Sequence, residues 1–243
     1  MEVSVLSWNV RGEDERKGAY LAHVLNWVKE NWNSGQEVDF IFLQEASAMN
    51  LENTLYNGLL SSMGYQVFRF RERADGRGDC YLFAVKGGWQ VEEASGYLQV
   101  WDPRELCGVP IRSPFYMEVN NGAIKLRLIN FHNAFGGGVS GACTRALAEK
   151  LKEDPNTPTI LAGDFNLRWD EMPDFEILYC LISNRFDHIL TSPCMNYICG
   201  DALDEDLEGR PVLWEYGEND ISSINGSDHC AIFGRYEIPE MDK

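Results

Sequence analysis

The chain has 243 residues, of which 44% are hydrophobic and 12% are aromatic. This composition is typical of a globular protein that can bury a full core, and it excludes an intrinsically disordered chain. The formal net charge of −17 excludes the basic footprint of a protein that binds nucleic acid tightly by charge alone. It does not exclude an enzyme that acts on phosphates, because bound cations can reverse the sign of the local field.

The start of the chain carries no recognisable targeting signal. Residues 1–9 lack the basic start and the continuous apolar stretch of a signal peptide, and apolar runs such as residues 40–43 are too short to span a bilayer. We therefore expect a cytoplasmic protein without a transmembrane segment. A leader that has been removed, or a secreted or delivered effector, is the alternative. The seven cysteines lack metal-ligand spacing and predict reduced thiols, with a Cys194–Cys199 disulfide as the alternative.

Short apolar runs bounded by Gly, Pro, Asn and Asp recur along the whole chain and predict strands. In chain order they cover residues 3–8, 40–44, 65–70, 80–85, 89–97, 115–119, 123–131, 159–163, 186–191 and 230–236. Amphipathic patterns between them predict helices over residues 17–33, 51–63, 140–153 and 174–183. Because the predicted strands far outnumber the predicted helices, the elements do not alternate as βαβ units. The sequence therefore predicts two packed sheets with helices outside, in a single domain over residues 1–243.

Several predicted strands end in polar residues of similar chemistry. The carboxylate, amide and imidazole side chains at these ends are Asn9, Glu45, His132, Asp164 with Asn166, and the Asp228-His229 pair before the last strand. Successive side chains on a strand alternate faces, so Asp164 and Asn166 are expected to point the same way. Five such ends predict one shared polar cleft.

Groups of this kind are those that hydrolysis of a phosphodiester requires. The anionic phosphate needs a metal or other cations to neutralise it, and carboxylate and amide oxygens suit a hard cation such as Mg²⁺. Water needs a base, the leaving oxygen needs a proton, and the transition state needs hydrogen-bond donors. The polar strand ends therefore predict a metal-dependent site for phosphate chemistry.

Four short motifs give the chain a resemblance to a known superfamily. They are Trp8-Asn9, Gln44-Glu45, Gly163-Asp164-Phe165-Asn166 and Ser227-Asp228-His229. In that order they resemble the endonuclease/exonuclease/phosphatase superfamily, and the resemblance spans nearly the whole chain. It implies a four-layer α/β sandwich of the DNase I type, in which two mostly antiparallel sheets are flanked by helices.

The seven tryptophans are expected in the core rather than in base-stacking platforms.

The resemblance implies a role for each matched residue of the metal and water site. Glu45 would hold the catalytic metal with Asn9 beside it, and Asp228 would complete this polar group. Asp164 and Asn166 would position or deprotonate the attacking water and touch the phosphate. The expected metal is Mg²⁺, with Mn²⁺ or Ca²⁺ as alternatives.

The resemblance also implies two His–acid pairs. His229 would contact the scissile phosphate and would be oriented by Asp187. His132 matches a second histidine of the DNase I branch, and its expected partner is Asp79. A neighbouring carboxylate favours the imidazolium form and fixes the ring. Together with Arg112, which resembles a phosphate-contacting arginine, these pairs would place an acid and a base on opposite sides of one phosphate.

The stretch from His132 to Gly138, which runs into a helix, looks closest to the cytolethal distending toxin B subunit. Arg11 and Asn133 are further expected phosphate contacts. The resemblance thus favours a Mg²⁺-dependent, DNase I-like endonuclease acting on DNA. Two alternatives stay open: a phosphoinositide or nucleotide phosphatase of the same superfamily, and a catalytically inactive interaction module. The sequence does not indicate whether a partner subunit or inhibitor exists.

Overall fold

The computed structural model describes residues 1–12, 15–46, 55–72, 79–97, 112–175, 178–184, 186–203 and 229–239. Its elements in chain order are β1 (Glu2–Asn9), α1 (Glu15–Asn31), β2 (Phe40–Gln44), α2 (Leu55–Ser62), β3 (Tyr65–Arg71), β4 (Cys80–Lys86), β5 (Gln90–Tyr97), β6 (Phe115–Asn120), β7 (Lys125–His132), α3 (Gly137–Leu151), β8 (Thr159–Asp164), the short 3₁₀ helix η1 (Trp169–Glu171), β9 (Tyr179–Asn184), β10 (Asp187–Thr191), β11 (Asn196–Leu203) and β12 (Ala231–Glu237). Strands therefore form at the apolar runs that predicted them.

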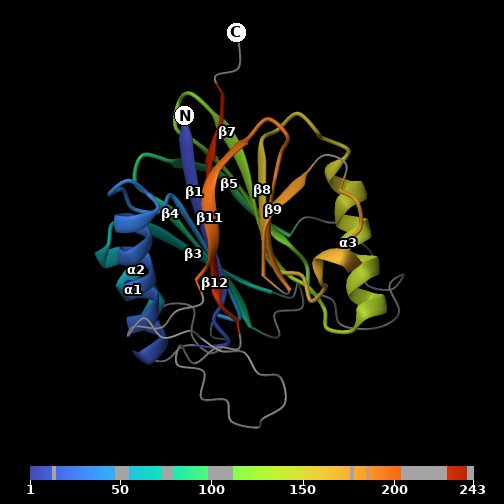
Figure 1. Ribbon diagram of the computed structural model, residues 1–243, viewed down its shortest axis with the longest axis horizontal. Coiled ribbons are helices and arrows are strands. Elements are labelled where there is room, and N and C mark those ends of the chain that lie inside the picture. Colours follow the sequence, from blue (N-terminus) through green and yellow to red (C-terminus); the bar gives the residue numbers. More distant parts are fainter. Residues whose placement is uncertain are drawn as a thin grey trace.

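The strands form two six-stranded sheets with the orders β11-β12-β1-β2-β4-β3 and β5-β6-β7-β8-β10-β9. Both sheets are mixed, because β1 pairs parallel with β2 and β7 pairs parallel with β8. Figure 1 shows α1 and α2 on the outer face of the first sheet and α3 on the outer face of the second. The predicted four-layer α/β sandwich is confirmed.

Three apolar clusters lie between these layers. In β1, Val3 and Val5 face the cluster between the sheets, whereas Leu6 and Trp8 face the cluster beneath α1 and α2. A third cluster, which includes Phe165, lies between the second sheet and α3. Each such side chain contributes roughly 1.5–3 kcal/mol when it is fully buried. The alternating pattern thus fixes which face of each strand points into the sandwich.

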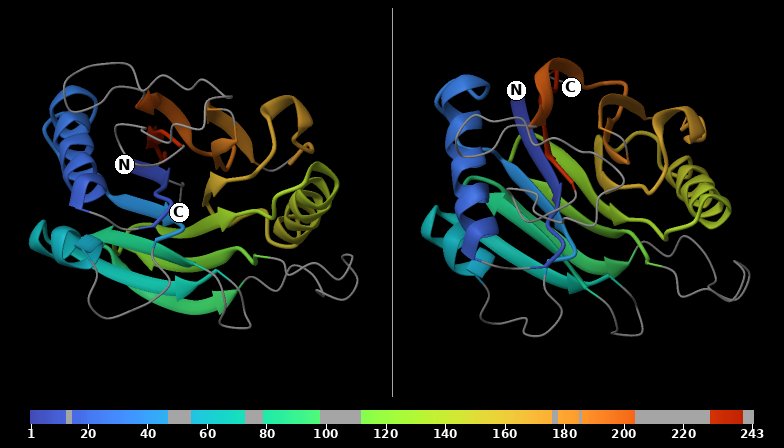
Figure 2. Two further views of the ribbon diagram at one scale, coloured as in Figure 1. Left: turned by 90° about the horizontal axis from the view of Figure 1, so that it is seen from below. Right: turned by 60° about the horizontal axis from the view of Figure 1, so that its bottom comes forward.

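The inward rows of four strands change from apolar to polar as the strands end. The apolar residues and the polar ones that follow them are Val3 and Val5 before Ser7 and Asn9 in β1, Phe40 and Phe42 before Gln44 in β2, Leu126 and Leu128 before Asn130 and His132 in β7, and Ile160 and Ala162 before Asp164 in β8. The two parallel pairs end at the same edge of the sandwich, which the left view of Figure 2 shows from below. Polar side chains therefore meet between the sheets at this edge.

Two elements differ from the sequence-based expectations. Residues 179–184 form strand β9, whereas the sequence predicted a helix over residues 174–183. They form a strand because they pair antiparallel with β10. Tertiary pairing overrides the local helical pattern there. Strand β11 was not predicted, because only its last residue is buried and its side chains show no apolar alternation.

Other sequence-based expectations concern cysteines, tryptophans and membrane spans. The five described cysteines whose state is defined are free, so a Cys194–Cys199 disulfide is not formed. Trp8 and Trp89 are buried as expected, but Trp169 is 52% exposed. Within the described ranges, no helix has the length and apolar character needed to cross a membrane.

Candidate active site

One carboxylate oxygen lies at the centre of the polar edge. Asp164 ends β8, and it is 2% exposed. The Nε2 atoms of His132 and His229 each lie 3.6 Å from Asp164 Oδ2, and the side-chain amide of Asn9 donates to the same oxygen at 3.1 Å. The fold therefore brings both histidines to a single anionic atom.

His132 ends β7 and pairs with Glu72. Its Nδ1 lies 3.0 and 2.9 Å from the two carboxylate oxygens of Glu72, and both side chains are 1% exposed. The predicted pairing with Asp79 is wrong. Asp79 sits across the β3–β4 hairpin, where its backbone carbonyl accepts from the Glu72 N–H at 2.9 Å. Glu72 instead continues the inward row of Phe68 and Phe70, which pack against the core between the sheets.

His229 precedes β12 and forms the second His–acid pair. Its Nδ1 lies 2.7 Å from Oδ2 of Asp187. Asp187 begins β10 opposite Asp164 in the antiparallel register, which brings this acid to the same edge. The indole of Trp8 donates to the His229 carbonyl at 3.0 Å and so ties the histidine to β1. His132 belongs to the second sheet and its partner Glu72 follows β3 of the first, whereas His229 precedes a strand of the first sheet and its partner Asp187 begins β10 of the second. Each His–acid pair therefore joins the two sheets beside Asp164.

Glu45 follows β2 in a left-handed backbone conformation with φ 52°. Such a conformation costs a non-glycine residue about 1–3 kcal/mol unless neighbours hold it. Here the Glu45 N–H donates to Glu72 Oε1 at 2.8 Å. Glu45 Oε1 lies 3.3 Å from the Asn9 amide nitrogen and 3.4 Å from His132 Nε2. Glu45 and Asp164 thus both lie beside Asn9 and His132.

Arg112 supplies a cation beside the first His–acid pair. Its Nε lies 3.3 Å from Glu72 Oε2, and its Nη1 contacts the His132 Nε2 atom. Nη1 also donates to the Asn133 carbonyl at 3.1 Å. The Arg112 side chain is 29% exposed, so part of it stays accessible to an anionic substrate.

Asn166 and Asn133 join the ends of β7 and β8. The Asn166 side chain donates to the Asn133 carbonyl at 2.9 Å, and its backbone N–H donates to Asp164 Oδ1 at 2.8 Å. The Asn133 side chain is directed away from these residues, and a phosphate contact of Asn133 stays a prediction. That side chain is fully buried, and its amide donates to the carbonyls of Ser140 and Phe165 and to a threonine hydroxyl, each at 2.9 Å.

Arg11 lies at the edge of the site, two residues beyond Asn9. It is exposed and left-handed, with φ 49°. Its N–H donates to Asn9 Oδ1 at 3.1 Å, and its carbonyl accepts from the buried Lys17 ammonium at 2.6 Å. The turn is therefore held from both sides, while contact of the Arg11 guanidinium with a substrate stays a prediction.

Burial and neighbouring charges shift the pKa values of several site residues. Burial opposes the charged form of His132, but the charge and hydrogen bond of Glu72 and the charge of Asp164 outweigh it, so the pKa of His132 is raised. Burial raises the pKa of Asp187 to about 6, against the effect of His229. Burial also raises the pKa of Asp79, and the charges of Glu72 and Glu45 add to this. The site is therefore a crowded group of carboxylates that favours added positive charge.

Gly163 allows β8 to approach β7 at the site. Its φ is 147°, and a Cβ atom there would lie 1.9 Å from the Phe131 carbonyl oxygen. Any larger residue would push the two strands apart directly before Asp164. This close approach explains the glycine of the Gly-Asp-Phe-Asn motif.

A buried amide pair joins the two sheets beneath the site. Gln44 Nε2 donates to Asn130 Oδ1 at 2.7 Å, and Asn130 Nδ2 donates to backbone carbonyls of β2 and β4 at 3.1 and 3.2 Å. Gln44 directly precedes Glu45, and Asn130 is two residues before His132. The pair therefore fixes the spacing between these two site residues.

Replacing Asn130 with leucine is expected to lower the free energy of unfolding by about 3 kcal/mol, because buried polar groups left without partners cost about 1–3 kcal/mol each. Urea unfolding of the purified variant measures this. The matched control is Asn196→Leu on β11, where the asparagine is exposed and the change should stay within about 0.5 kcal/mol. Equal stability of the two variants would contradict a linking role for Asn130.

The sequence model of the endonuclease/exonuclease/phosphatase family matches residues 6–229. The chain belongs to this family. No curated protein matches the chain.

Solved structures of the endonuclease/exonuclease/phosphatase fold resemble the chain over nearly its whole length. Humanized D. rerio TDP2 with 14 mutations has a TM-score of 0.66 at 18% identity, covering 97% of this chain and 99% of that one. A family protein from Bacteroides thetaiotaomicron has a TM-score of 0.64 at 16% identity, covering 97% of each chain. D. rerio TDP2 complexed with a single strand DNA product has a TM-score of 0.65 at 17% identity, covering 97% and 99%. At these identities the likeness shows a shared fold.

Members of the endonuclease/exonuclease/phosphatase family are phosphoester hydrolases that generally depend on a divalent cation. The described residues fit such a cation, because the carboxylates of Glu45 and Asp164 converge on the one side-chain amide of Asn9. Oxygen donors of this kind suit a hard divalent ion. The predicted ligand Asp228 lies outside the described residues.

A second group of potential ligands overlaps the site. Single atoms of Asp164, Asp187 and His229 lie within 4.8 Å of one another and could hold a metal ion. The Asp187 carboxylate is already engaged with His229 Nδ1, however, so it serves to orient the imidazole and is not a free ligand. We therefore favour the Glu45 side of Asp164 for the cation.

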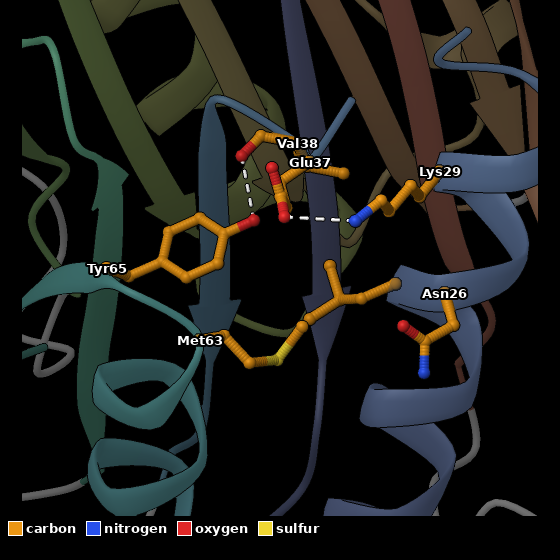
Figure 3. Close-up of a pocket in the computed structure, with 7 residues that line it drawn as sticks. Asn26, Lys29, Glu37, Val38, Met63 and Tyr65 are labelled. Atoms are coloured by element: carbon orange, nitrogen blue, oxygen red, sulfur yellow. Dashed lines mark hydrogen bonds and ion pairs between the residues drawn. The ribbon is translucent and has the colours of Figure 1, made fainter. Parts of the chain in front are cut away.

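A small pocket lies away from this site (Figure 3). It is lined by residues of α1, by the residues directly before β2, and by Met63 and Tyr65 at the start of β3, at the opposite end of β2 from Glu45. The Tyr65 hydroxyl donates to the Val38 carbonyl at 2.8 Å, and Lys29 pairs with Glu37 at 3.1 Å. None of the site residues lines this pocket.

Proposed function

We propose that the chain is a metal-dependent, DNase I-like endonuclease that hydrolyses DNA phosphodiester bonds by in-line attack of water, with the whole chain acting as one domain. The supporting observation is the approach of two histidines, one from each sheet and each paired with a buried carboxylate, to one oxygen of Asp164. In-line displacement uses one group that takes a proton from water and another, on the far side of the phosphate, that gives a proton to the leaving oxygen. Two imidazoles, each backed by a buried carboxylate, meet both needs.

In the proposed reaction the water oxygen attacks phosphorus while His229 Nε2 accepts the water proton. The phosphorus–oxygen bond to the leaving sugar oxygen breaks, and His132 Nε2 gives that oxygen a proton. The raised pKa of His132 favours this assignment, because it keeps the imidazole protonated at higher pH. Glu72 and Asp187 hold the two rings through Nδ1, so each Nε2 stays directed towards Asp164.

The other polar side chains have proposed roles in binding. Arg112 would donate to phosphate oxygens and so stabilise the negative charge of the transition state. Asn166 would help to position the water and the phosphate. Glu45, Asn9 and Asp164 would hold the divalent cation, with Asp228 as a further ligand. When bound, the cation supplies charge neutralisation at the phosphate.

DNA as the substrate is supported by two observations. Arg112 places a cation at the site, and Arg11 lies at its edge, in a chain whose net charge is −17. A structural neighbour, D. rerio TDP2, is complexed with a single strand DNA product. Long-range repulsion between the acidic chain and DNA opposes association, so we expect a high KM and a dependence on the cation for productive binding.

The proposed function is tested by a metal-dependent cleavage assay. Supercoiled plasmid is expected to be nicked with Mg²⁺ and spared with EDTA, and Mg²⁺ added back in excess should restore nicking, which excludes unfolding as the cause of the loss. Mn²⁺ and Ca²⁺ are compared in the same way. Parallel reactions contain abasic duplex, RNA and a phosphoinositide. Intact plasmid alongside phosphate release from the phosphoinositide would overturn the nuclease proposal.

A further inference from the structure

Phe135 is the most exposed large hydrophobic side chain of the described chain, at 83%. It lies three residues after His132, in the connection between β7 and α3. A single exposed apolar residue on a surface is ordinary. This one, however, is next to the site and on a fixed backbone.

The chain is anchored on both sides of Phe135. Before it, the buried Asn133 side chain makes three hydrogen bonds to neighbouring elements. After it, the Gly136 carbonyl accepts from the N–H of Val139 at 2.9 Å and from the N–H and hydroxyl of Ser140 at 3.0 and 2.9 Å. The connection is therefore a defined turn, and the ring is presented to solvent with little freedom left in the main chain. A contact made by such a group loses little conformational entropy on binding.

The same turn binds two side chains that have proposed roles at the phosphate. Both Arg112 and Asn166 donate to the Asn133 carbonyl. Two Cα–Cα steps of about 3.8 Å each put the Cα of Phe135 within about 7.6 Å of the Cα of Asn133. The carbonyl that binds a cation and an amide donor is thus two residues from an exposed aromatic residue, a main-chain spacing that one nucleotide can span.

We propose that Phe135 stacks on the nucleobase beside the scissile phosphate, which makes the β7–α3 turn a subsite for an unpaired base. This inference rests on the proposed action on DNA. Stacking tolerates any base sequence, because every base has a π face. In a duplex both faces of a base are already covered by its neighbours, so the subsite favours single-stranded or frayed DNA.

The test compares two single-stranded substrates: a short oligothymidylate, and the same backbone with abasic tetrahydrofuran units in place of the nucleosides. Phe135→Ala should raise KM for the oligothymidylate by about 5- to 100-fold, the range of one base–aromatic stack, with kcat little changed. KM for the abasic substrate should not change. Phe135→Trp should restore the wild-type KM.

The matched control is Tyr197→Ala, which removes a 43% exposed aromatic ring. Tyr197 pairs with Tyr236, near the end of β12 that is far from His229, so both KM values should remain those of the wild type.

Each other outcome overturns a different statement. If the wild type cleaves oligothymidylate and Phe135→Ala has the same KM, the base subsite is wrong and the proposed function stands. An equal rise in KM for both substrates would assign Phe135 a structural role instead. If the wild type cleaves no DNA with Mg²⁺, the proposed function fails. In that case, the fluorescence anisotropy of labelled oligothymidylate is used to measure Kd. Equal Kd values for wild type and Phe135→Ala would overturn the stacking proposal.

Discussion

Replacing His229 with alanine is expected to lower kcat for DNA hydrolysis by about 10²- to 10⁴-fold, the contribution of a positioned acid or base. The His229 Nε2 atom lies 3.6 Å from Asp164 Oδ2, and its Nδ1 is held by Asp187 at 2.7 Å. No other described imidazole approaches Asp164 from the first sheet. Initial rates on an oligonucleotide with Mg²⁺ measure the effect, and KM should change little because binding relies on the cation and Arg112.

Two further variants make the His229 result specific. His23→Ala removes a half-buried histidine of α1 and should leave kcat unchanged. Asp187→Asn keeps the shape of the orienting side chain but removes its charge, and kcat should fall by about 10- to 100-fold, as is typical for a group that orients another. Circular dichroism shows whether each variant is folded. A His229→Ala variant that keeps more than a tenth of the wild-type kcat would contradict a proton-transfer role.

Much of the fold and part of the site follow from alternation along the strands. Inward rows such as Val3-Val5 and Ile160-Ala162 end in Asn9 and Asp164, and both the core face and the polar end are visible in the sequence. The parallel pairing that brings these ends to one edge is a property of the whole sheet, so local pattern alone does not contain it. The family motifs, which imply that these residues share one site, predicted that arrangement.

The sequence was less informative where partners depend on a hairpin or a turn. Glu72 and Asp79 face each other at the ends of β3 and β4, and a choice between them needs the register. The same alternation, followed through Phe68 and Phe70, would have selected Glu72. Asn133 is polar and adjacent to His132, yet its side chain satisfies buried carbonyls of α3 and of Phe165, directly after β8. Only the packing of the helix against the sheet distinguishes this role from a substrate contact.

Glu72→Gln is expected to lower kcat by about 10²-fold, whereas Asp79→Asn should change it by less than about 3-fold. The Glu72 carboxylate accepts from His132 Nδ1 and from the Glu45 N–H, and it lies 3.3 Å from Arg112 Nε. In Glu72→Gln, the side-chain NH2 group would face these N–H donors and could not accept a hydrogen bond from them. These two isosteric changes are matched controls for each other, since both remove one negative charge from neighbouring positions of one hairpin.

The pH dependence of kcat tests whether Glu72 or Asp79 is the carboxylate paired with His132. The charge of Glu72 helps to raise the pKa of His132, so Glu72→Gln lowers that pKa. A histidine that acts in its protonated form then loses its proton at a lower pH, and the alkaline limb of the pH–rate profile moves to lower pH. Asp79→Asn should move this limb much less, and His132→Ala should remove it. An unchanged limb in Glu72→Gln, or an equal shift in Asp79→Asn, would contradict the assignment of Glu72 as the group that holds and charges this imidazole.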